Sequence, residues 1–131
     1  MQGRRYRSIK AWQLADNLAV AVYEATASFP KDERYGVVSQ MRRAGVSVAA
    51  NIAEGASRSS KKEYLQFLSI SRGSLAELRY YLHLAKRLGY LTDRNWEKWE
   101  GYSDEVGCVL YGLARSIEGA VFKGERVPTV V

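Results

Sequence analysis

The segment from Gln40 to Leu68 reads QMRRAGVSVAANIAEGASRSSKKEYLQFL and holds the strongest local signals in the chain. Small residues fill its first half, and Gly55 stands where a helix is expected to end. Ser60-x-x-Glu63 then forms a capping box, in which the serine accepts a backbone hydrogen bond at the start of a helix and the glutamate side chain reaches back. We therefore predict a closely packed helix pair whose connecting turn is bordered by basic residues.

Four segments carry the periodicity of amphipathic helices, at about residues 8–28, 31–56, 60–89 and 92–118. Phe29-Pro30 ends the first, because the residue before a proline is pushed out of helical geometry. Gly89 ends the third, after cations in its last turn. The connections are short, which favours antiparallel neighbours. We predict an all-α, antiparallel up-down-up-down four-helix bundle over residues 8–118, with a basic N-terminal arm (1–7) and a C-terminal tail (119–131).

Heptad-like repeats predict which residues of each segment face the core. In the first segment they are Leu14, Leu18, Val22, Ala25 and Phe29. In the second they are Val37, Met41, Ala44, Val48, Asn51 and Gly55. In the third they are Tyr64, Leu68, Ser71, Leu75, Leu78, Leu82 and Ala85. In the fourth they are Trp96, Trp99, Ser103, Val106, Leu110, Leu113 and Ile117.

Length and composition narrow the class of protein. With 131 residues the chain forms one domain, and its 2 prolines leave the segments intact. No apolar run is long enough to span a bilayer, so we expect no membrane association. The N-terminus lacks the apolar core of a signal peptide. A single Cys108 excludes an internal disulfide, and we expect a cytoplasmic protein.

Charge is unevenly distributed along the chain, whose net charge is +6. Residues 1–91 carry 15 basic and 7 acidic side chains, whereas residues 92–131 carry 5 and 7. The basic first part of the chain favours a polyanionic partner such as nucleic acid. The mildly acidic C-terminal part favours contact with the basic part of another copy of the chain.

The sequence contains no metal or cofactor signature. The only histidine is His83, and Tyr80 stands three residues before it, so a di-iron site with Glu-x-x-His pairs is excluded. One Cys and one His do not make a structural zinc site. Arg79-x-x-x-His83 is close to the Arg and His pair of some helical ribonucleases, one spacer residue short. The simpler interpretation places both on a helix flank, and we predict no catalytic residues.

The turn Gly55–Lys62 superficially resembles a phosphate-binding loop. It lacks the glycine before the lysine, since Ser60 stands there, and no strand precedes it. It is better interpreted as a link between helices. Arg58, Lys61 and Lys62 beside the next helix N-terminus suit a backbone phosphate, or are simply three solvated cations.

Polar side chains form a stripe beside the apolar seam of the second segment and recur on the third. They are Asn51, Glu54, Glu63, Ser74 and Glu77. In a catalytic interpretation the glutamates are acid–base or metal groups. We favour a structural network that sets helix register and subunit contacts.

Three groups of cations are candidates for contact with nucleic acid. They are Arg4, Arg5 and Arg7 in the arm, Arg42 and Arg43 in the second segment, and Arg58, Lys61 and Lys62 at the turn. Tyr6 within the arm adds a ring on which a base can stack.

Short motifs in a fixed order over residues 6–118 resemble a known family. They are Ala11-Trp12, Phe29-Pro30, Glu33-Arg34-Tyr35-Gly36, Gln40-Met-Arg-Arg-Ala44, Asn51-Ile-Ala-Glu-Gly55, Lys62-Glu-Tyr64, Phe67-Leu68, Gly73-Ser74-Leu-Ala-Glu77 and Ala85-Lys-Arg-Leu-Gly-Tyr-Leu91. In this order they resemble the bacterial four-helix-bundle family that includes proteins encoded in intervening sequences of large-subunit ribosomal RNA genes, some of them labelled ribosomal-protein-like. More distantly, they resemble accessory proteins of the reverse transcriptases of diversity-generating retroelements.

The resemblance implies a small cytosolic bundle without enzyme activity or cofactor, which assembles as a ring-shaped homopentamer. The expected partners are further copies of the chain, RNA or DNA, and a reverse transcriptase or other nucleic-acid enzyme. A ring needs head-to-tail contact between two different patches. We expect an acidic stretch to meet basic residues of the next subunit, with Asp93, Glu97, Glu100, Asp104 and Glu105 on one side and Arg42, Arg43 or Arg72 on the other.

Three functions therefore compete. The leading one is a non-enzymatic oligomeric bundle that binds nucleic acid, or a nucleic-acid enzyme, through basic surfaces. The second is a protein–protein adaptor in which the cations serve subunit contacts. The third is a helical ribonuclease that uses Arg79 and His83.

Overall fold

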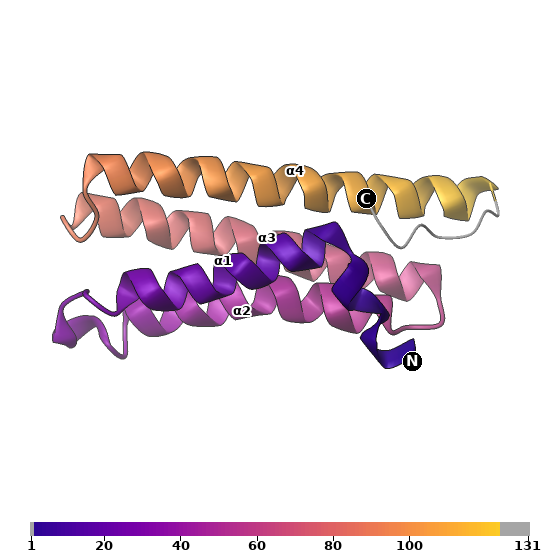
Figure 1. Ribbon diagram of the computed structural model, residues 1–131, viewed down its shortest axis with the longest axis horizontal. Helices are drawn as coiled ribbons and strands as arrows, with labels where there is room; N and C mark the ends of the chain where they lie inside the picture. Colours follow the sequence, from indigo (N-terminus) through magenta and orange to yellow (C-terminus); the bar gives the residue numbers. More distant parts are fainter. Residues whose placement is uncertain (1, 124–131) are drawn as a thin grey trace.

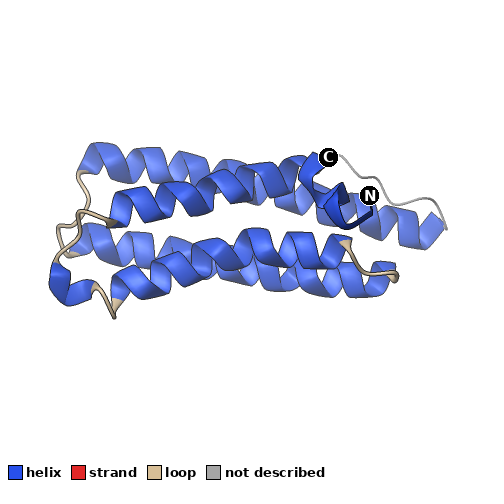
Figure 2. Cartoon of the chain, turned by 60° about the horizontal axis from the view of Figure 1, so that its bottom comes forward, coloured by secondary structure: helices blue, strands red, loops and turns tan. Residues whose placement is uncertain are grey.

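The structure, a computed structural model, describes the backbone of residues 2–123 and the side chains of residues 5–119. All regular structure in this part of the chain is helical, as Figure 2 shows. In chain order the elements are η1 (Gln2–Ser8), α1 (Lys10–Thr26), η2 (Lys31–Glu33), α2 (Val37–Ala56), α3 (Lys61–Arg87) and α4 (Asp93–Lys123).

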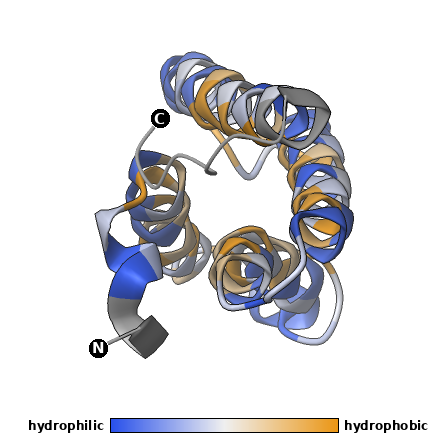
Figure 3. Ribbon diagram, turned by 90° about the vertical axis from the view of Figure 1, so that its right-hand side faces the viewer, coloured by the Kyte–Doolittle hydropathy of each residue, from blue (hydrophilic) through white to orange (hydrophobic). Residues whose placement is uncertain are grey.

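The four α-helices run alternately in opposite directions along one axis (Figure 1). α1 packs on α2, α2 on α3 and α3 on α4, and α4 also contacts α1. Seen along the axis, the apolar positions turn toward the space between the helices (Figure 3). The prediction of an all-α chain with four helices is confirmed. The core lies between the helices, because each has one apolar face to bury.

The predicted core positions are confirmed most fully in the second half of the bundle. All seven predicted positions of α3 are buried. In α4 six of the seven are buried and only Trp96 is half-buried. In α1 the buried face is shifted, with Ala11 and Ala15 fully buried and Leu14 half-buried. In α2, Ile52 is fully buried and Asn51 is half-buried, because this helix packs on both α1 and α3 and buries more than one narrow stripe.

The contact between α2 and α3 depends on small residues of α2. A Cβ at Gly55 would lie 2.9 Å from Cβ of Phe67 and 3.2 Å from the backbone oxygen of Tyr64. Gly55 lies inside α2, and the only positive φ among the described residues is at Gly89. The prediction that Gly55 terminates the helix is therefore wrong. Its role is to let α3 approach closely.

Hydrogen bonds also join α2 and α3. The buried Ser71 hydroxyl donates to the backbone oxygen of Val48. The hydroxyls of Ser47 and Ser74 form a hydrogen bond of 2.7 Å, in which either one can be the donor. These bonds fix the register of the two helices, since a shift by one residue would leave buried hydroxyls unpaired.

Local capping defines several helix ends. Ser60 Oγ accepts from the backbone N–H of Glu63 at 3.3 Å, so the predicted serine cap of α3 is confirmed. At its other end the Tyr90 N–H donates to the oxygen of Ala85 at 2.9 Å, while Gly89 adopts φ 81°. This is a Schellman motif, and Gly89 ends the helix as predicted.

Two boundaries differ from the sequence pattern. Residues Gln2–Ser8 of the expected arm form the 3₁₀-helix η1, which packs on α1 and α2. α4 continues to Lys123 rather than ending near residue 118, since a single Gly119 is not enough to break a helix. The remainder of the expected tail, residues 124–131, lies outside the described residues.

Replacement of Gly55 by alanine tests the close approach of α2 and α3. We expect Gly55→Ala to lower the free energy of unfolding by about 1–3 kcal/mol, because Phe67 and the Tyr64 backbone must move away. Gly73→Ala is the matched control, since a Cβ there meets nothing within 4 Å and should stabilise α3 by about 1 kcal/mol. Urea unfolding measures both variants. Stabilisation by both would show that the contact at Gly55 is not tight.

Candidate nucleic-acid interface

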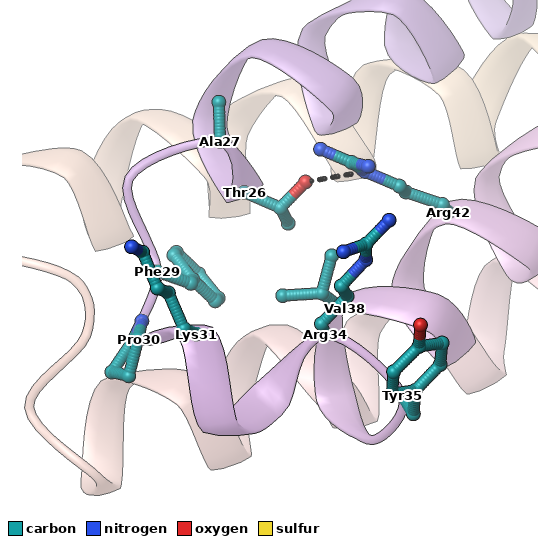
Figure 4. A pocket seen from close by; sticks show the side chains of 9 residues that line it. All are labelled: Thr26, Ala27, Phe29, Pro30, Lys31, Arg34, Tyr35, Val38 and Arg42. Carbon is teal, nitrogen blue, oxygen red and sulfur yellow. Dashed lines mark hydrogen bonds between the residues drawn. The ribbon is translucent and has the colours of Figure 1, made fainter.

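A basic groove lies where α1 connects to α2. Two adjoining hollows of about 550 and 340 Å³ share four lining residues, Arg34, Tyr35, Val38 and Arg42. Figure 4 shows the larger hollow. Arg34 lies in the turn before α2, Arg42 lies on α2 and Thr26 lies on α1. Further lining residues of the two hollows are Tyr23, Ala27, Phe29, Pro30, Lys31, Ser39 and Arg43. We call this surface the α1–α2 groove.

Contacts to the α3–α4 connection hold one wall of the α1–α2 groove. The Tyr90 hydroxyl donates to Glu33 Oε2 at 2.8 Å, and the rings of Phe29 and Tyr90 are 5.3 Å apart. The bond to Glu33 and then burial raise the pKa of Tyr90, and the charges of Glu33 and Asp32 add to the rise. The hydrogen bond thus holds the Glu33 carboxylate on Tyr90, in the α3–α4 connection.

Arg42 forms part of the opposite wall. Its Nε donates to Thr26 Oγ1 at 2.9 Å and its Nη2 to the backbone oxygen of Tyr23 at 3.2 Å. The guanidinium also lies 4.6 Å from the centre of the Tyr23 ring. Arg42 therefore satisfies a carbonyl in the last turn of α1, where cations are favoured. This predicted nucleic-acid contact also holds α1 and α2 together.

Other groove cations are more accessible. Lys31, Arg34 and Arg43 are exposed. Within the described residues, ion pairs are made by Arg58, Arg79 and Lys86, and no carboxylate pairs with a cation of the α1–α2 groove. Unpaired cations gathered around a hollow favour an anionic ligand.

The remaining predicted cations lie at the other end of α2. Arg58 pairs with Glu54 at 2.6 Å and lies over the ring of Phe67 at 4.8 Å, so it is largely occupied. Lys61 has contacts of its own, and Lys62 is exposed.

η1 lies at this same end of the bundle (Figure 1), and its Arg5 and Arg7 are exposed. The Arg4 side chain is outside the described side chains. From Arg42 to Ala56, the last residue of α2, the helix extends about 21 Å at about 1.5 Å per residue. The structure therefore divides the predicted cations between two surfaces rather than one.

The predicted polar stripe is brought together only in part. Asn51 Nδ2 donates to the backbone oxygen and hydroxyl of Ser47, at 2.8 and 2.9 Å, and Ser47 meets Ser74 on α3. Glu54 instead pairs with Arg58 in an exposed position.

The other two glutamates of the stripe stay within α3. Glu63 lies at its N-terminus, where its backbone N–H donates to the cap. Glu77 is near Tyr81, whose pKa is raised by burial first and then by the charge of Glu77 and a hydrogen bond to it. Glu54, Glu63 and Glu77 thus have separate surroundings, and the structure does not bring them together as an acid–base pair.

Arg79 and His83 have separate surroundings. Arg79 Nη2 lies 2.6 Å from Asp104 Oδ1 and 3.4 Å from Glu100 Oε2, so its guanidinium joins α3 to α4. His83 is exposed, and its ring lies 6.2 Å from that of Trp96. An arginine held by two carboxylates is poorly suited to bind a reacting phosphate.

The structure also offers no metal site or membrane segment among its described residues. Their His, Cys, Asp and Glu side chains form no group of three that could hold a metal ion. Over the same part of the chain, none of the helices combines the length and apolar character needed to cross a bilayer.

Lys31, Arg34 and Tyr35 were missed as candidates from sequence reasoning. They lie in a connection without apolar periodicity, and only the folded α1–α2 hairpin brings them beside Arg42. The available signal was Glu33-Arg34-Tyr35-Gly36 following Phe29-Pro30, in which an arginine and a tyrosine stand in a turn between a proline and a glycine.

Comparison with known proteins identifies relatives of the chain. The model of the family described as 23S rRNA-intervening sequence protein matches residues 7–112. A crystal structure of a protein of unknown function from the S23 ribosomal protein family of Bacteroides thetaiotaomicron superposes with a TM-score of 0.71 and 23% sequence identity, over 79% of this chain and 97% of that one. None of the curated proteins matches the chain. Neither description that does match names a catalytic activity.

A comparison of two neighbouring arginines tests the double role of Arg42. We expect Arg42→Ala to lower the free energy of unfolding by about 1–2 kcal/mol, because Thr26 and the Tyr23 carbonyl lose a charged donor. Arg43→Ala removes an exposed cation and should change it by less than about 0.5 kcal/mol. Thermal and urea unfolding provide the values. Equal, small effects would show that Arg42 does not hold α1.

Proposed function

Since the chain belongs to the family of 23S rRNA-intervening sequence proteins, we propose that it is a non-enzymatic helical-bundle protein that binds nucleic acid through basic surfaces. The observation that carries the proposal is the α1–α2 groove. Its cations line a hollow of about 550 Å³ without carboxylate partners among the described residues. The family takes its name from sequences that interrupt 23S rRNA, so RNA is the first nucleic acid to test.

The distribution of charge supports a polyanion as the ligand. Three acidic residues of α4 are paired within the chain, with Asp104 and Glu100 on Arg79 and Asp93 at 3.8 Å from Lys86. The cations of the α1–α2 groove and those of η1 have no such partners in the described part of the chain. Phosphates along a backbone can contact both surfaces, since the surfaces are about 21 Å apart along α2.

Charge reversal separates the groove from net charge. We expect Arg34→Glu with Arg43→Glu to weaken binding to a mixed-sequence RNA by about 10-fold or more, and to lower the slope of log affinity against log salt by about 2. Lys98→Glu with Arg115→Glu is the matched control, because both are exposed on α4 and give the same change in net charge. Fluorescence anisotropy at several salt concentrations measures all three proteins. Absent or salt-independent binding by the unaltered protein would remove the proposal.

We also propose that the chain assembles as a ring of identical subunits, as its sequence resemblance implies. Large apolar side chains remain exposed on both halves of the bundle, among them Val20 and Val46 on α1 and α2, and Ile70 and Tyr111 on α3 and α4. A head-to-tail contact needs two different patches, and these residues supply apolar surface for both.

Light scattering tests the ring directly. At micromolar concentration we expect a mass of about five chains of 14.8 kDa each, because the sequence resemblance implies a homopentamer and a closed head-to-tail contact forms a ring. The mass should be insensitive to added salt if apolar contacts dominate. A mass of one chain would contradict the proposal, and a steep dependence on salt would show that charges hold the subunits together.

A further inference from the structure

We propose that the α1–α2 groove binds an unpaired nucleotide of a single-stranded nucleic acid, with its base stacked on Tyr35 and its phosphate held by Arg34 and Arg43. This inference rests on the proposed function and names the form of nucleic acid that the groove selects. It also adds an aromatic contact to a surface so far described by charge alone.

Tyr35 is the most exposed large hydrophobic residue among the described residues, with 85% of its surface open to solvent. It follows η2, which is held by the 2.8 Å hydrogen bond from the Tyr90 hydroxyl to Glu33. The ring therefore stands on an anchored turn, although packing within the chain leaves it uncovered. One face lies near the Arg34 guanidinium, 5.4 Å from the ring centre. A base on the ring would extend this cation–aromatic pair into a stack.

Cations surround the position that a phosphate attached to such a base would occupy. Arg34 lines both hollows, and Arg43 lines the smaller one beside Tyr23. The Arg42 guanidinium stands between α1 and this cluster, fixed by Thr26. Both hollows have volumes within the range of small-ligand sites, about 300–1,000 Å³. One nucleotide unit, with a flat base and a charged phosphate, matches both the ring and the cations.

Other anionic partners fit less of this surface. The bases of a duplex are paired and stacked on one another, so a duplex offers Tyr35 no free base face. An acidic or phosphorylated peptide would use the arginines and leave the ring exposed. Single strands combine a backbone that follows cations with bases that stack on aromatic side chains.

The test compares one RNA sequence as a single strand and as a duplex. The single strand has about 12 nucleotides, within the range of site sizes of single-strand-binding proteins. Tyr35→Ala should weaken binding of the single strand by about 10-fold and leave binding of the duplex unchanged, whereas Tyr35→Phe should retain the affinity for the single strand. Tyr111→Ala is the matched control, because that tyrosine is exposed as well and its ring lies 5.4 Å from an arginine, Arg72, on the other half of the bundle. It should leave both affinities unchanged.

Each outcome has a separate meaning. If the unaltered protein binds both forms of RNA and Tyr35→Ala has no effect on the single strand, the inference is overturned while the proposed function stands. If neither form binds, both fail. A phosphoserine peptide that displaces the single strand at equal concentration, from the unaltered protein and from Tyr35→Ala alike, would also overturn the inference, since the site would then recognise charge alone.

Discussion

The close approach of α2 and α3 is the constraint on which the rest of the bundle depends. Gly55 has no Cβ, and the space that one would need is filled by Phe67 and Tyr64. Ser71 can therefore reach the backbone oxygen of Val48, and the two helices gain a fixed register. Once this pair is fixed, α1 packs on α2, α4 packs on α3, and α1 and α4 contact each other. The same contact positions the turn that connects α2 to α3.

The opposite end of the bundle is stabilised differently. There the α1–α2 and α3–α4 connections meet through the Tyr90–Glu33 hydrogen bond and the ring contact between Tyr90 and Phe29. Arg42 then joins α2 to the last turn of α1. The polar groups Tyr90, Glu33 and Arg42 are half-buried, whereas Phe29 belongs to the buried core. The groove walls are thus held by connections, which is how many binding sites combine a rigid helical frame with a chemically variable surface.

The sequence predicted the fold well and the site only in part, for a physical reason in each case. Apolar residues at steps of three and four must face a core, so every predicted position of α3 is buried. Gly55 was misinterpreted because a glycine near a helix end has two uses, and only the neighbouring helix decides between them. Arg34 and Tyr35 belong to a turn, where no periodicity indicates direction. Their place beside Arg42 depends on how α1 and α2 fold back on each other.

Ion pairs between α3 and α4 bear on which side chains could form a contact between subunits. Glu100 and Asp104 were expected to contact a neighbouring chain, but Arg79 already binds both. Releasing them for a contact between chains would expose Arg79 again, so the net electrostatic gain would be small. In the proposed ring, exposed apolar side chains such as Val46 and Ile70 would then contribute more to the subunit contact than these two carboxylates.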